Sequence, residues 1–176
     1  MNIKNYIALD KLKDGRAVVI RAVRPTDKAA TAQSWSLLSE ETIYRRYCSH
    51  RGAPTEQELK ELTEVDFVTK VHLIAEFIDG DGLIIGDASY EAFDYEHPED
   101  QVEIAFTVAD RVQGNGLGSI LFKHLVRVGM QSGIKHFEAI VLPCNNEMKH
   151  IITDCGYNVK RWSDEGELHY DINLSA

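Results

Sequence analysis

The spacing of hydrophobic residues divides the chain into strand-like and helix-like segments. Two alternating segments come first and three segments with helical spacing follow, and from about residue 70 the period changes from near 3.6 to near 2. Asp14-Gly15 predicts a hairpin turn between the first two strands, and Thr55 with Glu58 forms a capping box that begins a helix. The predicted strands cover 6–11, 17–23, 71–78, 83–90, 102–108, 137–142, 157–161 and 168–172, and the predicted helices cover 27–38, 39–47, 55–63, 118–131 and 146–155.

This order of elements predicts a single mixed α/β (α+β) domain over residues 1–176. A length of 176 residues, with 44% hydrophobic and 27% charged residues, is typical of one globular domain with its own core. No apolar stretch approaches the roughly 20 residues that a membrane-spanning helix needs, and residues 1–10 lack the apolar segment of a signal peptide. We therefore expect a cytoplasmic protein with no membrane partner.

Charge and cysteine content narrow the function classes. The net charge is −9, with 19 Lys and Arg against 28 Asp and Glu. This sign disfavours binding to nucleic-acid phosphates, so no nucleic-acid partner is expected. Cys48, Cys144 and Cys155 are widely spaced and do not fall at zinc-ligand spacing. We expect them to be reduced thiols in the core, and we expect no metal site.

Three glycines carry the strongest chemical signal. Gly114, Gly116 and Gly118 lie between a predicted strand and the start of an amphipathic helix. Backbone N–H groups at a helix N-terminus that no side chain covers bind phosphate oxygens, and the helix dipole assists them. The run does not fit a Rossmann fingerprint, which would need glycine where Ser119 stands, and it lacks the Gly-Lys-Ser/Thr of a P-loop. The glycine run therefore predicts a binding site for a pyrophosphate.

The same segment resembles a known cofactor loop. Gln113-Gly114-Asn115-Gly116-Leu117-Gly118 resembles the coenzyme A pyrophosphate loop, Arg/Gln-x-x-Gly-x-Gly/Ala, of the GNAT N-acetyltransferases. Residues 141–148, followed by Cys155-Gly156-Tyr157, resemble the family's strand, its Asn-x-x-Met helix and its Gly-aromatic turn. Over residues 12–162 the chain is similar to the acetyltransferase domain of bacterial protein lysine acetyltransferases of the Pat type. The N-terminal segments that carry this likeness are 14–16, 21–27, 38–47, 59–62 and 65–67.

The resemblance implies a fold, a cosubstrate and a reaction. The fold is a mixed central sheet flanked by helices and splayed where coenzyme A enters. The reaction is the transfer of an acetyl group from acetyl-CoA to a primary amine, with a protein lysine as the first substrate class. Asn145 is implied near the pantetheine arm. The implied cofactor-binding residues are Phe106, Thr107, Val108, Gln113, Gly114, Asn115, Gly116, Leu117, Gly118, Ser119 and Asn145.

Glu103 matches the strand glutamate that serves as general base in the family. Strand alternation places it with Ala105 and Thr107 on the less apolar face. A lysine amine, with a reference pKa of about 10.4, must lose a proton before it attacks a thioester. A partly desolvated glutamate with a raised pKa accepts that proton directly or through water. From the residues alone, a solvated carboxylate is the alternative interpretation.

Other roles are less determined by the sequence. When the amine attacks the thioester, the carbonyl oxygen becomes negatively charged. We expect the backbone N–H of Val108 to stabilise this charge. No general acid is identified, since 146–154 contain no tyrosine and Tyr157 is expected in the core. Arg111 and Lys123 flank the glycine loop and are candidates for phosphate contacts.

Several alternatives stay open at this point. The acceptor is either a protein lysine or a small-molecule amine, because the acceptor side is built from loops that the sequence does not decode. A non-catalytic acyl-CoA sensor is a further alternative, against which the glutamate at position 103 argues. The last alternative is a structural interaction module that binds no cofactor. The oligomeric state and the acyl-chain preference are not predicted.

Overall fold

One sheet of eight strands forms the centre of the molecule. The structure is a computed structural model and describes residues 2–175, so Met1 and Ala176, the ends of the predicted domain, lie outside the described residues. The strand order is β1-β2-β3-β4-β5-β6-β8-β7, and only β5 and β6 are parallel. The strands are β1 (Ile7–Lys11), β2 (Ala17–Ala22), β3 (Lys70–Phe77), β4 (Ile84–Ala92), β5 (Gln101–Val108), β6 (His136–Val141), β7 (Asn158–Asp164) and β8 (Glu167–Asn173).

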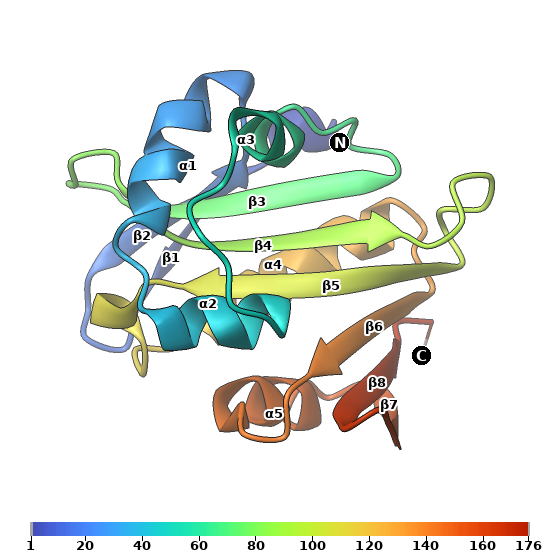
Figure 1. Cartoon of the computed structure of the whole chain (residues 1–176). Coiled ribbons are helices and arrows are strands. Elements are labelled where there is room, and N and C mark those ends of the chain that lie inside the picture. Colours follow the sequence, from blue (N-terminus) through green and yellow to red (C-terminus); the bar gives the residue numbers. More distant parts are fainter. Residues whose placement is uncertain (1, 176) are drawn as a thin grey trace.

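Helices cover both faces of this sheet. The five α-helices are α1 (Lys28–Trp35), α2 (Glu40–Tyr47), α3 (Glu56–Thr63), α4 (Leu117–Gln131) and α5 (Asn146–Thr153). Figure 1 shows α1, α2 and α3 on one face, α4 behind the sheet and α5 beside β6. The amphipathic α4 buries Leu121, Leu125 and Val128 completely, and the core lies between these residues and the sheet. The predicted mixed α/β fold is therefore confirmed.

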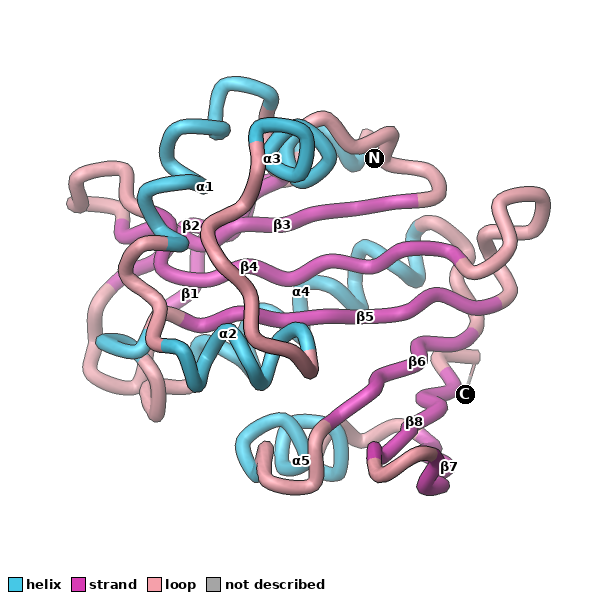
Figure 2. Tube along the Cα trace, viewed as in Figure 1, coloured by secondary structure: helices cyan, strands magenta, loops and turns pink. Residues whose placement is uncertain are grey.

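Local sequence signals account for most element boundaries (Figure 2). The Ser39 hydroxyl caps α2, and Thr55 and Glu58 form the predicted capping box at the start of α3. The first predicted helix begins later than expected, at Lys28, because the segment Pro25–Asp27 forms a 3-10 turn first. The last predicted helix ends at Thr153, two residues earlier than expected.

The pairing between β5 and β6 is short, and this opens the sheet. The two strands pair only at Gln101–His136, Val102–Phe137 and Glu103–Glu138. Beyond Glu103 the strands diverge, and Figure 1 shows them separating toward α5. The predicted splay of the sheet therefore begins at the residue that the sequence singled out as the base.

Two sequence expectations concern the rest of the molecule. Within residues 2–175, no helix combines the length and apolar character needed to cross a membrane. The three cysteines are free thiols, but Cys144 is exposed and Cys48 and Cys155 are half-buried. The expected core placement is wrong for Cys144, because it follows β6 in a surface turn at Pro143-Cys144 rather than facing the sheet.

Candidate active site

A cleft of about 700 Å³ lies at the point where β5 and β6 separate. This volume lies within the range of small-molecule and cofactor sites, about 300 to 1,000 Å³. Its walls come from α2, β5, the glycine loop, α4 and α5. Ten of the eleven predicted cofactor residues line it: Phe106, Thr107, Val108, Gln113, Gly114, Gly116, Leu117, Gly118, Ser119 and Asn145. Asn115 does not line the cleft; its backbone oxygen accepts a hydrogen bond from the Lys13 N–H at 3.0 Å.

The glycine loop presents the uncovered start of α4 to this cleft. Gly114 and Gly116 have φ values of 75° and 84°, a left-handed conformation that side chains with a Cβ adopt at a cost. Gly116 is the N-cap of α4 and supplies no side chain to cap its first turn. The first N–H groups of α4 are therefore available to an anion.

Gly118 serves packing rather than the turn. Its φ is not in the left-handed region, and a Cβ placed there would lie 2.7 Å from Ile151 Cδ1 on α5. The absence of a side chain lets α4 and α5 approach each other beside the cleft. In this loop only Gly114 and Gly116 have positive φ, so a side chain at position 118 would collide with α5 without straining the turn.

Two polar side chains hold the loop against α2. The Gln113 amide donates to Val108 O at 3.0 Å and to Thr42 Oγ1 at 3.1 Å. The Asp110 carboxylate accepts from Ser39 N, Ser39 Oγ and Thr42 Oγ1 at 2.9, 2.6 and 2.9 Å. Burial opposes ionisation of Asp110, but the Ser39 and Thr42 hydrogen bonds outweigh it and lower its pKa. The Gln113 side chain thus orients the loop.

The open edge of β5 directs backbone N–H groups toward the gap. Ala109 N–H donates to Ile85 O at 2.9 Å, on the β4 side. In an antiparallel ladder successive residues face opposite sides, so the N–H groups of Phe106 and Val108 face away from β4. No β6 residue pairs with them, since that pairing ends at Glu103. Val108 N–H is thus located as an oxyanion donor would be.

Glu103 lies at the fork of the two strands, just outside the residues that line the cleft. Its side chain is exposed, and within residues 2–175 it has no hydrogen bond or ion pair. Partial removal from bulk water raises the pKa of Glu103. Arg46 opposes this rise, and the charges of Glu138, Glu91 and Glu167 add to it. The carboxylate is therefore a better proton acceptor than an isolated glutamate.

Two cations at the cleft were not among the predicted cofactor residues: Lys13 had no signal in the sequence, and Arg46 belongs to the Tyr44–Tyr47 cluster, for which the sequence favours packing and salt bridges over substrate contact. Lys13, in the turn after β1, lines the cleft, and its Cε lies 3.3 Å from the position of a Cβ built on Gly116. It forms no ion pair within the described part of the chain. Arg46 lines the cleft from α2, packs over the Tyr47 ring at 4.7 Å and has a buried Nε without a described partner. Sequence spacing gives no signal for Lys13, which lies far from the loop along the chain.

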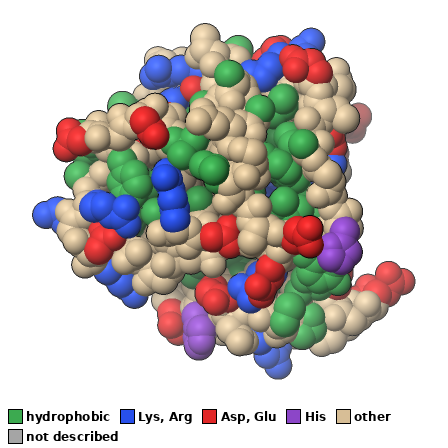
Figure 3. Space-filling model, turned by 60° about the vertical axis from the view of Figure 1, so that its left-hand side comes forward, with side chains coloured by type: hydrophobic (Ala, Val, Ile, Leu, Met, Phe, Trp, Pro, Cys, Tyr) green, Lys and Arg blue, Asp and Glu red, His purple; other side chains and the backbone are tan. Residues whose placement is uncertain are grey.

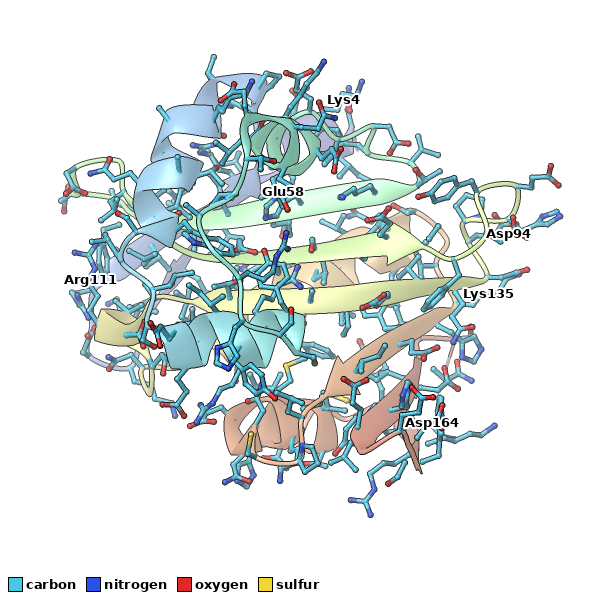
Figure 4. All side chains as sticks on the ribbon, in the orientation of Figure 1. Lys4, Glu58, Asp94, Arg111, Lys135 and Asp164 are labelled. Carbon is cyan, nitrogen blue, oxygen red and sulfur yellow. The ribbon has the colours of Figure 1, made fainter. Side chains whose placement is uncertain are left out.

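The remaining candidates divide between the cleft and the surface. Arg111 does not line the cleft, and Figure 4 places it at the outer edge of the molecule. Lys123 lines the cleft, but its Nζ pairs with Asp10 at 2.7 Å. Tyr157 packs against the core as expected and also contributes to the cleft wall. Asn145 Oδ1 accepts from Met148 N at 3.2 Å and caps α5. Residues 2–175 contain no group of three metal-ligating side chains suited to a metal ion.

Comparison with known proteins identifies the family. Residues 17–158 match the acetyltransferase (GNAT) domain. The chain belongs to the GNAT acetyltransferase family. This GNAT domain is 34% identical to the acetyltransferase Pat of Mycolicibacterium smegmatis over 147 residues, which are 83% of the chain but 43% of that protein. It is 28% identical over 159 residues to the acetyltransferase PA5475 of Pseudomonas aeruginosa, covering 89% of the chain and 83% of the relative. The chain thus spans less than half of the length of the Pat relative.

Solved structures agree with this assignment. The GNAT domain of S. lividans PAT superposes with a TM-score of 0.87 at 29% identity, over 95% of this chain and 96% of that one. The cAMP-binding acyltransferase from Mycobacterium smegmatis superposes with a TM-score of 0.66 at 26% identity. The match covers 97% of this GNAT domain and 48% of that chain. The yncA protein of Salmonella typhimurium, determined with its cofactor acetyl-CoA, gives 0.71 at 19% identity over 90% and 94%, which supports the fold alone.

Proposed function

We propose that this chain is a single acetyltransferase domain that transfers an acetyl group from acetyl-CoA to the amine of a protein lysine. One observation carries the proposal: the glycine loop and the open edge of β5 line one cleft, and Glu103 lies on the same strand at the last position that pairs with β6. The sheet supports a single domain, because strands from the N-terminal and C-terminal parts of the chain both belong to it. A cytoplasmic location stays a prediction.

The residues at the cleft fit a molecule with a pyrophosphate and a narrow arm. The uncovered N–H groups at the start of α4 and the Lys13 ammonium suit the phosphates. The gap between β5 and β6, with Asn145 on its far wall, suits the pantetheine arm. The thioester carbonyl would then lie near Val108 N–H.

In the proposed reaction Glu103 accepts a proton from the acceptor ammonium, directly or through a water. The free amine nitrogen forms a bond to the thioester carbonyl carbon, and Val108 N–H stabilises the negative charge that develops on oxygen. Collapse of this tetrahedral intermediate breaks the C–S bond, and the electron pair leaves with sulfur as a thiolate. A thiol pKa of about 8.5 allows this departure without a general acid. The second proton of the attacking nitrogen passes to this thiolate, directly or through water, so that the products are a neutral amide and a free thiol.

A protein acceptor is favoured by the relatives and by charge. The chain is 34% identical to acetyltransferase Pat of Mycolicibacterium smegmatis, in line with its resemblance to the Pat-type protein lysine acetyltransferases, and this supports a protein substrate. The net charge of −9 suits a cationic acceptor, and Figure 3 shows acidic side chains gathered over the lower half of one face. A small amine is the second candidate, supported by the same charge. Release of free thiol from acetyl-CoA, assayed with lysine-bearing proteins and with small amines, separates the two.

Acetyl-CoA is expected to protect the protein against thermal unfolding. A ligand that binds only the folded state at a hundred times its dissociation constant adds about 2.7 kcal/mol to the free energy of unfolding. Differential scanning calorimetry measures the shift, with ADP as the control nucleotide. A shift no larger than that with ADP would contradict use of the cleft for acetyl-CoA.

Lys13→Gln is expected to weaken coenzyme A binding about 3- to 10-fold, because it removes a cation from the phosphate end of the cleft. Binding of pantetheine, which has no phosphate, should not change. The matched control is Lys11→Gln, on the same hairpin but outside the cleft. If isothermal titration calorimetry gives the Lys13 and Lys11 variants equal affinities for coenzyme A, Lys13 does not contribute to phosphate binding.

A further inference from the structure

Glu103 belongs to a row of carboxylates that crosses the sheet. It is in register with Glu91 on β4 and with Glu138 on β6, and Glu138 is in register with Asp171 on β8. Residues in register on neighbouring strands point to the same face, and adjacent strands lie about 4.8 Å apart. Four acidic side chains on four adjacent strands therefore lie side by side on the face that carries Glu103.

Three of these four carboxylates have a polar partner, and Glu103 has none within residues 2–175. The partners are Lys70 Nζ at 3.0 Å and Tyr95 Oη at 2.8 Å for Glu91, Gln101 Nε2 at 2.8 Å and His169 Nδ1 at 3.2 Å for Glu138, and His136 Nδ1 at 2.8 Å for Asp171. The partners differ in charge. Glu91 is neutralised by a lysine, whereas Glu138 is held by a neutral amide and by a histidine that is charged only when protonated.

The charges that act most strongly on Glu103 come from four neighbouring elements. Arg46 contributes the cation from α2, and Glu91, Glu138 and Glu167 contribute negative charge from β4, β6 and β8. Cys48, which follows α2, carries no charge here, because burial and then the neighbouring carboxylates Glu167 and Glu103 raise the pKa of its thiol to about 11. Glu103 thus has two in-register neighbours, Glu91 and Glu138. Glu91 pairs with a lysine, whereas no permanent cation neutralises Glu138.

We propose that Glu138 is a positioning residue that acts through Glu103: its negative charge, which no permanent cation neutralises at the last paired position of β5 and β6, makes the neighbouring carboxylate a stronger proton acceptor. The same charge adds to the negative potential that attracts an ammonium group to the fork of the strands. This inference rests on the proposed function, in which Glu103 is the base.

Direct titration of Glu103 tests the inference without an acceptor. Carbon-13 NMR of protein labelled at the glutamate carboxyl carbons follows each titration, and the signal missing from Glu103→Gln assigns Glu103. In Glu138→Gln the midpoint of Glu103 is expected to fall by about 0.5 pH unit or more, since a unit charge at this spacing contributes on that order. Glu138→Asp, which keeps the charge, should restore most of the midpoint.

Asp171→Asn is the matched control, because it removes a carboxylate from the same row two strands away from Glu103. Its effect on the Glu103 midpoint should stay below about 0.2 pH unit. Equal shifts in the two variants, or no shift in Glu138→Gln, would overturn the role of Glu138. As a secondary readout, the acid limb of the pH profile of thiol release should move to lower pH in Glu138→Gln, in step with the Glu103 midpoint. A clear midpoint shift in a protein that acetylates no amine would instead count against the proposed function.

Discussion

Glu103→Gln is expected to lower turnover by about 10²- to 10⁴-fold near neutral pH while leaving coenzyme A affinity nearly unchanged. The amide keeps the size of the side chain and loses the proton acceptor. Cofactor binding should survive because Glu103 lies outside the residues that line the cleft. Steady-state thiol release and calorimetric titration with coenzyme A measure the two quantities, with Asp171→Asn as a control that retains turnover.

The pH dependence of this variant separates a base from a positioning role. Glu103 acts as a base only when ionised. Its side chain is exposed, yet the protein around it removes part of its hydration and raises its pKa. Wild-type activity should therefore fall as the pH drops through that raised value, and the variant should lack this limb. The deficit should shrink as the pH approaches the amine pKa, about 10.4 for lysine. A deficit that stays constant from about pH 7 to 10 would mean that Glu103 positions the acceptor, and full activity at neutral pH would make it a solvated carboxylate.

Gly116→Val is expected to reduce coenzyme A affinity by at least about tenfold, a loss of about 1.4 kcal/mol or more. Two effects combine at this residue. The φ of 84° strains any β-branched side chain, and its Cβ would lie 3.3 Å from Lys13 Cε. The added methyl groups would also cover the first N–H groups of α4. Isothermal titration calorimetry measures the affinity.

Gly133→Val is the matched control for this prediction. Gly133 follows the other end of α4, has a φ of 81° and has open space around its Cβ position. Its valine variant should lose a similar amount of stability from backbone strain, roughly 1 to 2 kcal/mol, and should bind coenzyme A normally. Wild-type affinity in Gly116→Val would contradict the assignment of the loop. An equal loss in both variants would attribute the effect to stability.

The order of the elements and the location of the glycine loop could be predicted from the sequence alone. These features depend on local physics. Helical and strand periodicity, the caps at Ser39 and Thr55, and the glycines at 114 and 116 act within a few residues of the chain, so their effects follow from spacing. Side-chain alternation along a strand likewise predicted that Glu103 lies on the less apolar face of β5. Its role as base stays a prediction.

Contacts between residues far apart in the chain could be read only from the folded structure. The register of β5 against β6, and the residue at which that pairing stops, depend on the packing of the whole sheet and leave no local signal. For this reason spacing alone did not predict the carboxylate row from Glu91 to Asp171, the approach of Lys13 to Gly116, or the contact of α5 with Gly118. Each of these contacts joins residues far apart in the chain, and only the fold sets their distance.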